Sequence, residues 1–153
     1  MPRLRVLFPG VQLTIVGADP RGRIRQLPRD DVRLTGFVPD LDPLLEEAAV
    51  VVAPVRIGGG QRMKVLYAMA AGKAVVTTTR GAEGLDAPGT ASALRIEDDA
   101  DGIARATAAL LDSPSLRHDI GRRGRALVEE HYAPHAYARR AEAIYDELRR
   151  IAA

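Results

Sequence analysis

The chain has 153 residues and a formal net charge of +2, with 46% hydrophobic and 27% charged residues. This balance predicts a globular protein that buries a core, and the slight basic excess favours anionic partners. The absence of cysteine excludes disulfides, thiolate catalysis and cysteine-bound zinc. Aromatic residues make up 4% and tryptophan is absent, so no nucleic-acid partner is predicted.

No apolar run approaches the roughly 18 to 20 residues that a membrane span requires. The first ten residues also lack the long apolar stretch of a secretory signal. No internal repeat or low-complexity linker interrupts the chain. We therefore expect a cytoplasmic protein whose residues 1–153 form a single domain.

Predicted strands alternate with predicted helices in the first two thirds of the chain. Residues 11–17 and 32–36 are β-branched and alternate between apolar and polar, which predicts two strands. Asp42 as N-cap and Pro43 as first helical residue then begin a short helix that ends near Ala49. This first part therefore has the order strand, strand, helix.

The same alternation continues to residue 96. The continuous apolar run at residues 50–54 predicts a strand covered on both faces. A helix is expected over residues 61–71, and strands over residues 74–79 and, more weakly, 91–96. Because parallel strands need crossover helices, this order predicts a doubly wound, mostly parallel, Rossmann-like α/β sheet.

The remainder of the chain is predicted to be helical. Apolar residues recur at helical spacing over residues 98–111, and Ser113 with Pro114 caps a further helix. The last helix, over residues 135–151, carries an apolar stripe that should pack against another surface. That stripe consists of Tyr137, Ala141, Ile144, Tyr145, Leu148 and Ile151.

Three consecutive glycines, Gly58, Gly59 and Gly60, stand between the buried strand and the next helix. The first N–H groups of a helix have no partner within it, and glycines let the backbone approach an oxygen closely with positive φ. Strand, loop and helix N-terminus are therefore a candidate anion site. The spacing matches neither a Walker loop nor the dinucleotide fingerprint, so the loop alone is a weak signal.

Two cations, Arg62 and Lys64, fall in the expected first turn of this helix. The helix dipole disfavours a cation there by roughly a few tenths of a kcal/mol, whereas a bound diphosphate would make both favourable. Arg56 is a candidate third charge. The alternative is that both cations are ordinary solvated residues and that Tyr67 fills a groove between helices.

Helical spacing divides this helix into two faces. The predicted apolar face carries Met63, Leu66 and Ala70. The opposite face, which we take as the candidate ligand face, carries Gln61, Lys64, Tyr67 and Ala68.

Residues 36–38, 58–70 and 72–76 resemble the motifs of the C-terminal domain of GT-B-fold glycosyltransferases, in the retaining group 1 family. The resemblance extends over nearly the whole chain. It implies a domain that binds a nucleotide-sugar donor, while an N-terminal domain, missing here, brings the acceptor. It also implies that the nucleotide-sugar is a substrate and that no cofactor or metal takes part.

The resemblance assigns roles residue by residue. Arg62 and Lys64 would hold the donor diphosphate and stabilise its charge as it leaves, which is the catalytic role expected in a retaining transfer. The glycines would approach the sugar phosphate, and the loop after the second strand would border the base. The candidate donor-binding residues are thus Phe37, Val38, Gly58, Gly59, Gly60, Gln61, Tyr67 and Glu83.

Two departures from the family pattern bear on this assignment. Many members carry two glutamates eight positions apart where this chain has Gly59 and Tyr67, so ribose recognition is left to one phenolic hydroxyl or to Glu83. The family's first strand, central in the order 3-2-1-4-5-6, is also absent, which would leave two unpaired strand edges. The chain is then a fragment, residues 3–8 take the place of that strand, or another chain fills the gap.

Other functions remain open at this point. No general acid and base pair stands out, so we expect little transfer by this chain alone. His118, His131 and His135 fall in the helical region away from the strand ends, which argues against a histidine site. The main alternative is a degenerate, non-catalytic module that binds a partner, and a flavodoxin-like domain comes last. Peripheral membrane association of the full enzyme is also left open.

Overall fold

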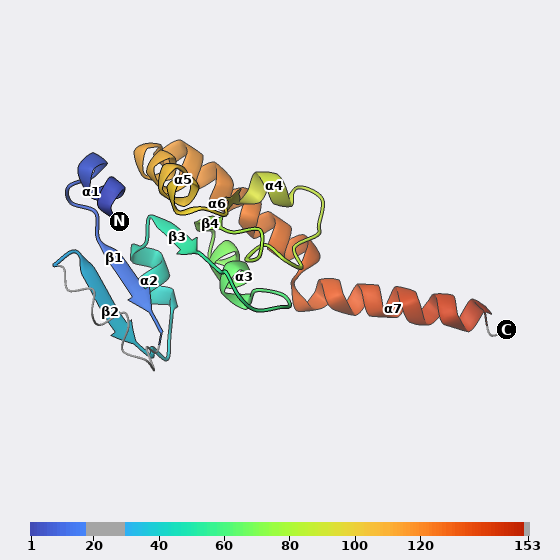
Figure 1. Cartoon of the computed structure of the whole chain (residues 1–153). Helices are drawn as coiled ribbons and strands as arrows, with labels where there is room; N and C mark the ends of the chain where they lie inside the picture. Colours follow the sequence, from blue (N-terminus) through green and yellow to red (C-terminus); the bar gives the residue numbers. More distant parts are fainter. Residues whose placement is uncertain (18–29, 152–153) are drawn as a thin grey trace. The chain divides into compact units, whose positions relative to one another are not determined.

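The computed structural model describes residues 1–17 and 30–151 (Figure 1). The contacts divide the chain into two compact units, Met1–Glu47 and Ala48–Ala153, each with its own parallel sheet. Both units combine parallel strands with helices, which confirms the predicted α/β class. Whether residues 1–153 act as one nucleotide-sugar-binding domain stays a prediction.

The first unit contains two strands and two short helices. These are α1 (Pro2–Leu7), β1 (Leu13–Val16), β2 (Val32–Gly36) and α2 (Asp42–Glu47). Strands β1 and β2 pair in parallel, and the side chain of Arg5 in α1 binds the carboxylate of Asp31, just before β2. Residues 3–8 are therefore mostly helical, and the idea that they replace the missing strand is wrong.

The start of α2 differs slightly from the prediction. The helix begins at Asp42 itself rather than after it. The backbone N–H of Asp42 donates to the carboxylate of Asp40 at 2.9 Å. The capping oxygen therefore comes from the aspartate two residues earlier, because a side chain outside the helix can reach the unpaired N–H groups of its first turn.

The second unit is built on a three-stranded sheet in the order β3-β4-β5. Its strands are β3 (Val50–Ala53), β4 (Ala74–Thr77) and β5 (Arg95–Ile96), all parallel. Every residue of β4 is buried, whereas β3 is mostly half-buried. The full burial predicted for residues 50–54 is therefore not met by β3, which lies at the edge of this sheet among the described residues, and is found in the central strand β4 instead.

Helices α3 (Met63–Ala70), α5 (Ala100–Asp112) and α6 (Pro114–His131) accompany this sheet. Leu110 of α5 and Ile120 of α6 pack with Ala74 and Val76 of β4 in one hydrophobic cluster. The hydroxyl of Ser113 accepts the N–H of Leu116, so the predicted cap of α6 is confirmed. The core of the unit thus lies between β4 and these two long helices.

The strand predicted over residues 91–96 is mostly wrong. Residues Thr90–Ala93 form the short helix α4, and only Arg95–Ile96 belong to a strand. The helix begins after Gly89, whose φ of 92° lies in the left-handed region that favours glycine. A short alternating segment does not distinguish one helical turn from a strand, since both place a few apolar side chains inward.

Helix α6 approaches the turn between α3 and β4 very closely. A Cβ added at Gly121 would lie 2.0 Å from the carbonyl oxygen of Gly72. Backbone atoms there leave no room for a side chain, and the oxygen cannot move without shifting the start of β4. Gly121 therefore fixes how near α6 lies to the sheet.

The last helix, α7 (Pro134–Ile151), leaves its apolar stripe uncovered within the described residues. Only Ala136 is buried, while Tyr145 and Leu148 are 65% and 55% exposed. In Figure 1 the helix runs away from the sheet of its own unit beyond its first turn. The prediction that this stripe packs against another surface is not met by the described part of the chain.

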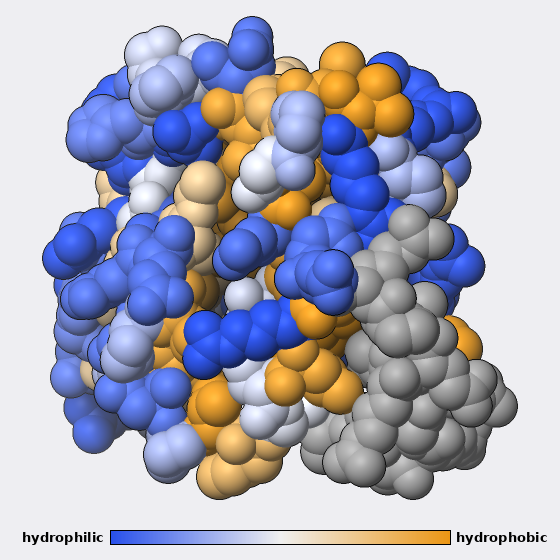
Figure 2. Space-filling model, turned by 90° about the vertical axis from the view of Figure 1, so that its left-hand side faces the viewer, coloured by the Kyte–Doolittle hydropathy of each residue, from blue (hydrophilic) through white to orange (hydrophobic). Residues whose placement is uncertain are grey.

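Apolar side chains also reach the surface elsewhere. On the face drawn in Figure 2 they lie among hydrophilic ones, and Val6 of α1 is 81% exposed. No helix within residues 1–17 and 30–151 combines the length and apolar character needed to cross a bilayer.

The strand pairings agree with the expected topology. Among the described residues, β1 pairs with β2 alone and β3 pairs with β4 alone. These are the neighbours found in the order 3-2-1-4-5-6 when the central strand is left out. Each unit therefore has one of the two unpaired strand edges that the sequence predicted, at β1 in the first unit and at β3 in the second, among the described residues.

Candidate functional site

The glycine-rich loop follows β3 at the carboxyl edge of the sheet. Gly58 and Gly60 have φ values of 118° and 78°, as expected for glycines that turn the backbone in the left-handed region. A Cβ added at Gly58 would lie 3.1 Å from Nη1 of Arg62. Glycine at this position thus provides both the backbone conformation and the space for the neighbouring guanidinium group.

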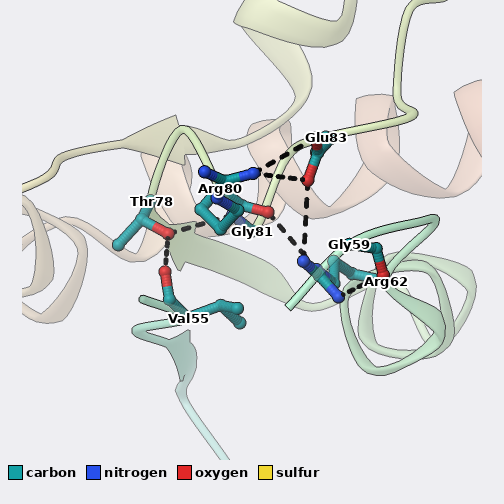
Figure 3. A network of polar contacts seen from close by, with 7 residues as sticks. All are labelled: Val55, Gly59, Arg62, Thr78, Arg80, Gly81 and Glu83. Atoms are coloured by element: carbon teal, nitrogen blue, oxygen red, sulfur yellow. Dashed lines mark hydrogen bonds and ion pairs between the residues drawn. The ribbon is translucent and has the colours of Figure 1, made fainter. Parts of the chain in front are cut away.

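Arg62 is the N-cap residue of α3 rather than a residue within its first turn, and it folds back over the loop. Its side chain is only 13% exposed. Nη1 donates to the carbonyl oxygen of Gly59 at 2.8 Å, and Nε donates to that of Arg80 at 3.3 Å (Figure 3). Arg62 therefore links the loop after β3 to the loop after β4.

A carboxylate completes this arrangement. Oε2 of Glu83 lies 3.6 Å from Nη2 of Arg62 and 3.4 Å from Nη1 of Arg80, so one carboxylate faces two guanidinium groups. Nη2 of Arg62 is buried and has no hydrogen-bond partner. Two carbonyl oxygens and one loose ion pair within the chain thus offset part of the unfavourable interaction between this cation and the helix dipole.

Arg80 was missed by sequence reasoning. The further cation that the sequence analysis named beside Arg62 and Lys64 was Arg56, which is exposed in the loop after β3. A signal did exist, because Arg80 is a basic residue in the loop directly after a buried strand, at the edge where ligands bind in such sheets.

Threonine hydroxyl groups hold the two loops together. The hydroxyl of Thr78 donates to the carbonyl oxygen of Val55 and accepts the N–H of Gly81 at 2.9 Å (Figure 3). The buried hydroxyl of Thr77 donates to the carbonyl oxygen of Ala53 at 2.8 Å. These bonds place the backbone on both sides of Arg80, so the Arg80 carbonyl that binds Arg62 is well supported.

The predicted faces of α3 are partly wrong. Met63 is 67% exposed and Ala70 is also exposed, whereas Ala68 is buried. Leu66 is buried as predicted. The buried set consists of Val65, Leu66, Ala68 and Met69. The helix is only eight residues long and apolar on several sides, so spacing alone did not identify the face that packs inward.

Lys64 and Tyr67 lie on the exposed side of α3, as predicted. Tyr67 is 42% exposed. Lys64 does not take part in the Arg62 network and is not among the residues that line the two hollows described below. The structure therefore brings Arg62, Gly59 and Glu83 together and leaves Lys64 on the surface.

Gln61 contacts two other segments of the same unit. Its Nε2 donates to the carbonyl oxygen of Gly84 at 3.4 Å, and its Oε1 accepts from the hydroxyl of Tyr137 at 3.1 Å. These residues line a polar hollow of about 330 Å³ together with His131 and Arg140. His131 is thus nearer to the glycine-rich loop than the sequence suggested.

A larger hollow of about 640 Å³ lies at the carboxyl ends of β4 and β5. The residues that line it include Thr79, Arg80, Glu83 and Asp98. The hydroxyl and the N–H of Thr79 donate to Asp98 at 2.7 and 2.8 Å. These two hydrogen bonds hold the pKa of Asp98 below its ordinary value, and the bond from the hydroxyl group has the larger effect.

Phe37 and Val38 follow β2 in the first unit, and Phe37 is 83% exposed. Their contact with a base therefore stays a prediction. Within residues 1–17 and 30–151 no group of three histidine or acidic side chains could hold a metal ion.

Comparison with known proteins identifies the family. The model of "Glycosyl transferases group 1" matches residues 1–113. A phosphatidyl-myo-inositol mannosyltransferase of Mycolicibacterium smegmatis is 34% identical over 123 residues, which is 76% of this chain and 32% of that protein.

Solved structures agree with this match. Sucrose-phosphate synthase of Thermosynechococcus elongatus has a TM-score of 0.69 and 25% identity, over 90% of this chain and 38% of that one. TarM has a TM-score of 0.74 and 17% identity, over 94% of this chain and 30% of that one, and supports the fold alone.

The chain thus spans about a third of the length of these relatives. This partial coverage is consistent with one domain of a GT-B enzyme, as the motifs at residues 36–38, 58–70 and 72–76 indicated. With a family model matched over residues 1–113, the chain belongs to the group 1 glycosyl transferases.

Proposed function

We propose that this chain is the donor-binding domain of a retaining GT-B glycosyltransferase and that Arg62 holds the diphosphate of a nucleotide-sugar. One observation carries the proposal. The guanidinium group of Arg62 stands at the N-terminus of α3, between the loops after β3 and β4, with a buried Nη2 that lacks a hydrogen bond. An anion placed there would gain a charge-assisted bond and the favourable end of the helix dipole.

The proposed catalytic role follows from charge. In a transfer to an acceptor the bond between the sugar and the diphosphate breaks, and negative charge develops on the leaving phosphate oxygen. Arg62 would stabilise this charge, and Lys64 would contact the same diphosphate from the exposed side of the first turn of α3. The glycines at positions 58 to 60 would let the sugar phosphate approach the backbone.

Recognition of the rest of the donor is also part of the proposal. Tyr67 offers a hydroxyl group, and Gln61 and Glu83 offer further polar groups close to the loop. Phe37 and Val38 would border the base. The donor is a substrate, and no cofactor or metal is assigned.

The acceptor and the setting rest on the longer relatives. Since the chain spans about a third of their length, we propose that an N-terminal domain of a longer enzyme binds the acceptor. The relative's name includes phosphatidyl-myo-inositol, a lipid, which supports peripheral association of the full cytoplasmic enzyme with a membrane surface. The sugar is proposed to be a hexose, as the word mannosyltransferase suggests.

Isothermal titration calorimetry with uridine, guanosine and adenosine diphosphate-sugars tests the proposal. We expect at least one donor to bind and Arg62→Gln to weaken its binding about tenfold or more. Arg125→Gln is the matched control, because Arg125 also forms an ion pair but lies exposed on α6. Circular dichroism shows whether each variant is folded.

The proposal is overturned if the folded wild-type chain binds no donor, or if Arg62→Gln binds as well as Arg125→Gln. The first outcome would favour a degenerate module that binds a partner. Two observations favour that second function, namely Tyr67 at a position where many family members have a glutamate, and the uncovered stripe of α7.

A further inference from the structure

The carboxylate of Glu83 lies where the proposed diphosphate would have to bind. It faces Nη2 of Arg62 at 3.6 Å and Nη1 of Arg80 at 3.4 Å, within the same compact unit. A carboxylate and a phosphate present the same feature to a guanidinium group, namely paired oxygens that carry negative charge. The two anions would therefore compete for the same donors.

We propose that Glu83 is an internal substitute for the ligand's anion, that the diphosphate displaces it, and that Arg80 then binds the diphosphate together with Arg62. This inference rests on the proposed function and changes two assignments within it. Arg80 becomes a binding residue, and Glu83 becomes a residue that opposes binding.

The geometry of Arg62 supports displacement. A charge-assisted hydrogen bond normally measures about 2.7 to 2.9 Å, so a separation of 3.6 Å is a loose ion pair. It leaves the N–H groups of Nη2 without an acceptor, whereas Nε and Nη1 are both bonded to backbone carbonyl oxygens. The guanidinium group is thus fixed on one side and incompletely satisfied on the side that faces Glu83.

Access to Nη2 requires Glu83 to move. Nη2 is buried, so a ligand oxygen reaches hydrogen-bond distance only when a neighbouring group makes room. The Glu83 side chain is 43% exposed, so it can turn outward into water at a small cost in free energy. Arg80 is 53% exposed, so its guanidinium group, once released from Glu83, can follow the incoming anion.

Calorimetric titration of the whole chain with inorganic pyrophosphate and with uridine diphosphate tests this inference at one fixed ionic strength. We expect Glu83→Gln to tighten binding about fivefold, which is the upper range for the loss of one exposed ion pair. Arg80→Gln should weaken binding by a similar factor of about five.

Glu129→Gln is the matched control. Glu129 also pairs with an arginine, Arg125, but lies on the exposed surface of α6, so its substitution makes the same change in net charge away from the site. It should leave both affinities unchanged. Thermal unfolding followed by circular dichroism establishes that the variants are folded.

The outcomes separate the two proposals. If wild-type chain binds pyrophosphate through Arg62 but Glu83→Gln binds it equally or more weakly, Glu83 does not oppose the ligand and the inference is wrong while the proposed function stands. If Arg80→Gln has no effect, the role of Arg80 is wrong. If neither the wild-type chain nor Glu83→Gln binds either probe, the proposed function fails together with the inference.

Discussion

The hydroxyl group of Tyr137 donates a 3.1 Å hydrogen bond to Oε1 of Gln61, which joins the first turn of α7 to the residue just after the three glycines. The amide nitrogen of Gln61 donates in turn to the carbonyl oxygen of Gly84 in the loop after β4. Gln61 therefore connects three segments that are far apart in the sequence. Movement at the start of α7 would be transmitted to the glycine-rich loop through one side chain.

Tyr137→Phe should loosen the start of α7 without unfolding the chain. The substitution removes one exposed hydrogen bond, whose net contribution to the free energy of unfolding is about 1 kcal/mol or less. We expect faster hydrogen exchange of the backbone amides in the first turn of α7 and in the glycine-rich loop. Tyr145→Phe is the control, because Tyr145 lies on the same helix and is 65% exposed. Equal exchange in both variants would show that the Tyr137 bond does not hold α7.

Gly121→Ala should destabilise the second unit strongly. Its methyl group would lie 2.0 Å from the carbonyl oxygen of Gly72, and a backbone atom cannot turn aside. We therefore expect the free energy of unfolding to fall by about 1 to 3 kcal/mol. Gly102→Ala provides the contrast, because the atom nearest to its methyl group would be Oε2 of Glu97 at 2.3 Å, the end of a flexible side chain, with Cβ of Glu97 at 3.2 Å. In urea unfolding Gly102→Ala should lose clearly less stability than Gly121→Ala. An equal loss of stability in the two variants would contradict the close approach of α6 to the turn at Gly72.

Leu110→Ala and Leu148→Ala make the same chemical change in opposite environments. Leu110 is 0% exposed in the cluster with β4, whereas Leu148 is 55% exposed on α7. We expect Leu110→Ala to cost about 2 to 5 kcal/mol in urea unfolding, because it leaves a cavity. Leu148→Ala should cost much less in the isolated chain. A large loss for Leu148→Ala would mean that the stripe of α7 is covered in solution.

Asp98 should give the chain a measurable acid dependence. Hydrogen bonds from Thr79 lower its folded-state pKa, so this contribution to stability is fully present above the ordinary value of 3.8 and is lost as the pH falls through the folded-state value. Thr79→Val should raise the pKa of Asp98 in carboxyl-carbon NMR titrations. Asp119 is the internal reference, because Arg122 and Arg123 lower its pKa without help from Thr79. An unchanged Asp98 titration would refute the assignment.

Patterns local in the sequence were sufficient for much of the fold. The boundaries of β2 and the cap of α6 follow from β-branched alternation and from a serine before a proline, and both agree with the structure. The inward face of α3 could not be predicted, because Met63 and Val65 are both apolar and packing against the rest of the unit decides which is buried. Local spacing carries no information on such a neighbour.

The candidate site was predictable only in part for a similar reason. That Arg62 lies at the start of α3 beside the glycines followed from the sequence, although it is the N-cap and not, as predicted, a residue of the first turn. Its contacts with Arg80 and Glu83 did not, because these residues lie 18 and 21 positions further along the chain and meet Arg62 only where two loops converge. Lys64 is exposed on α3 and takes no part in the contacts of Arg62, so its place at the diphosphate stays a prediction.

A structure of the chain with a bound nucleoside diphosphate tests the central claim most directly. The account predicts a phosphate oxygen within about 2.7 to 3.2 Å of a guanidinium nitrogen of Arg62. A diphosphate bound elsewhere, with Nη2 of Arg62 still buried beside Glu83, would contradict it.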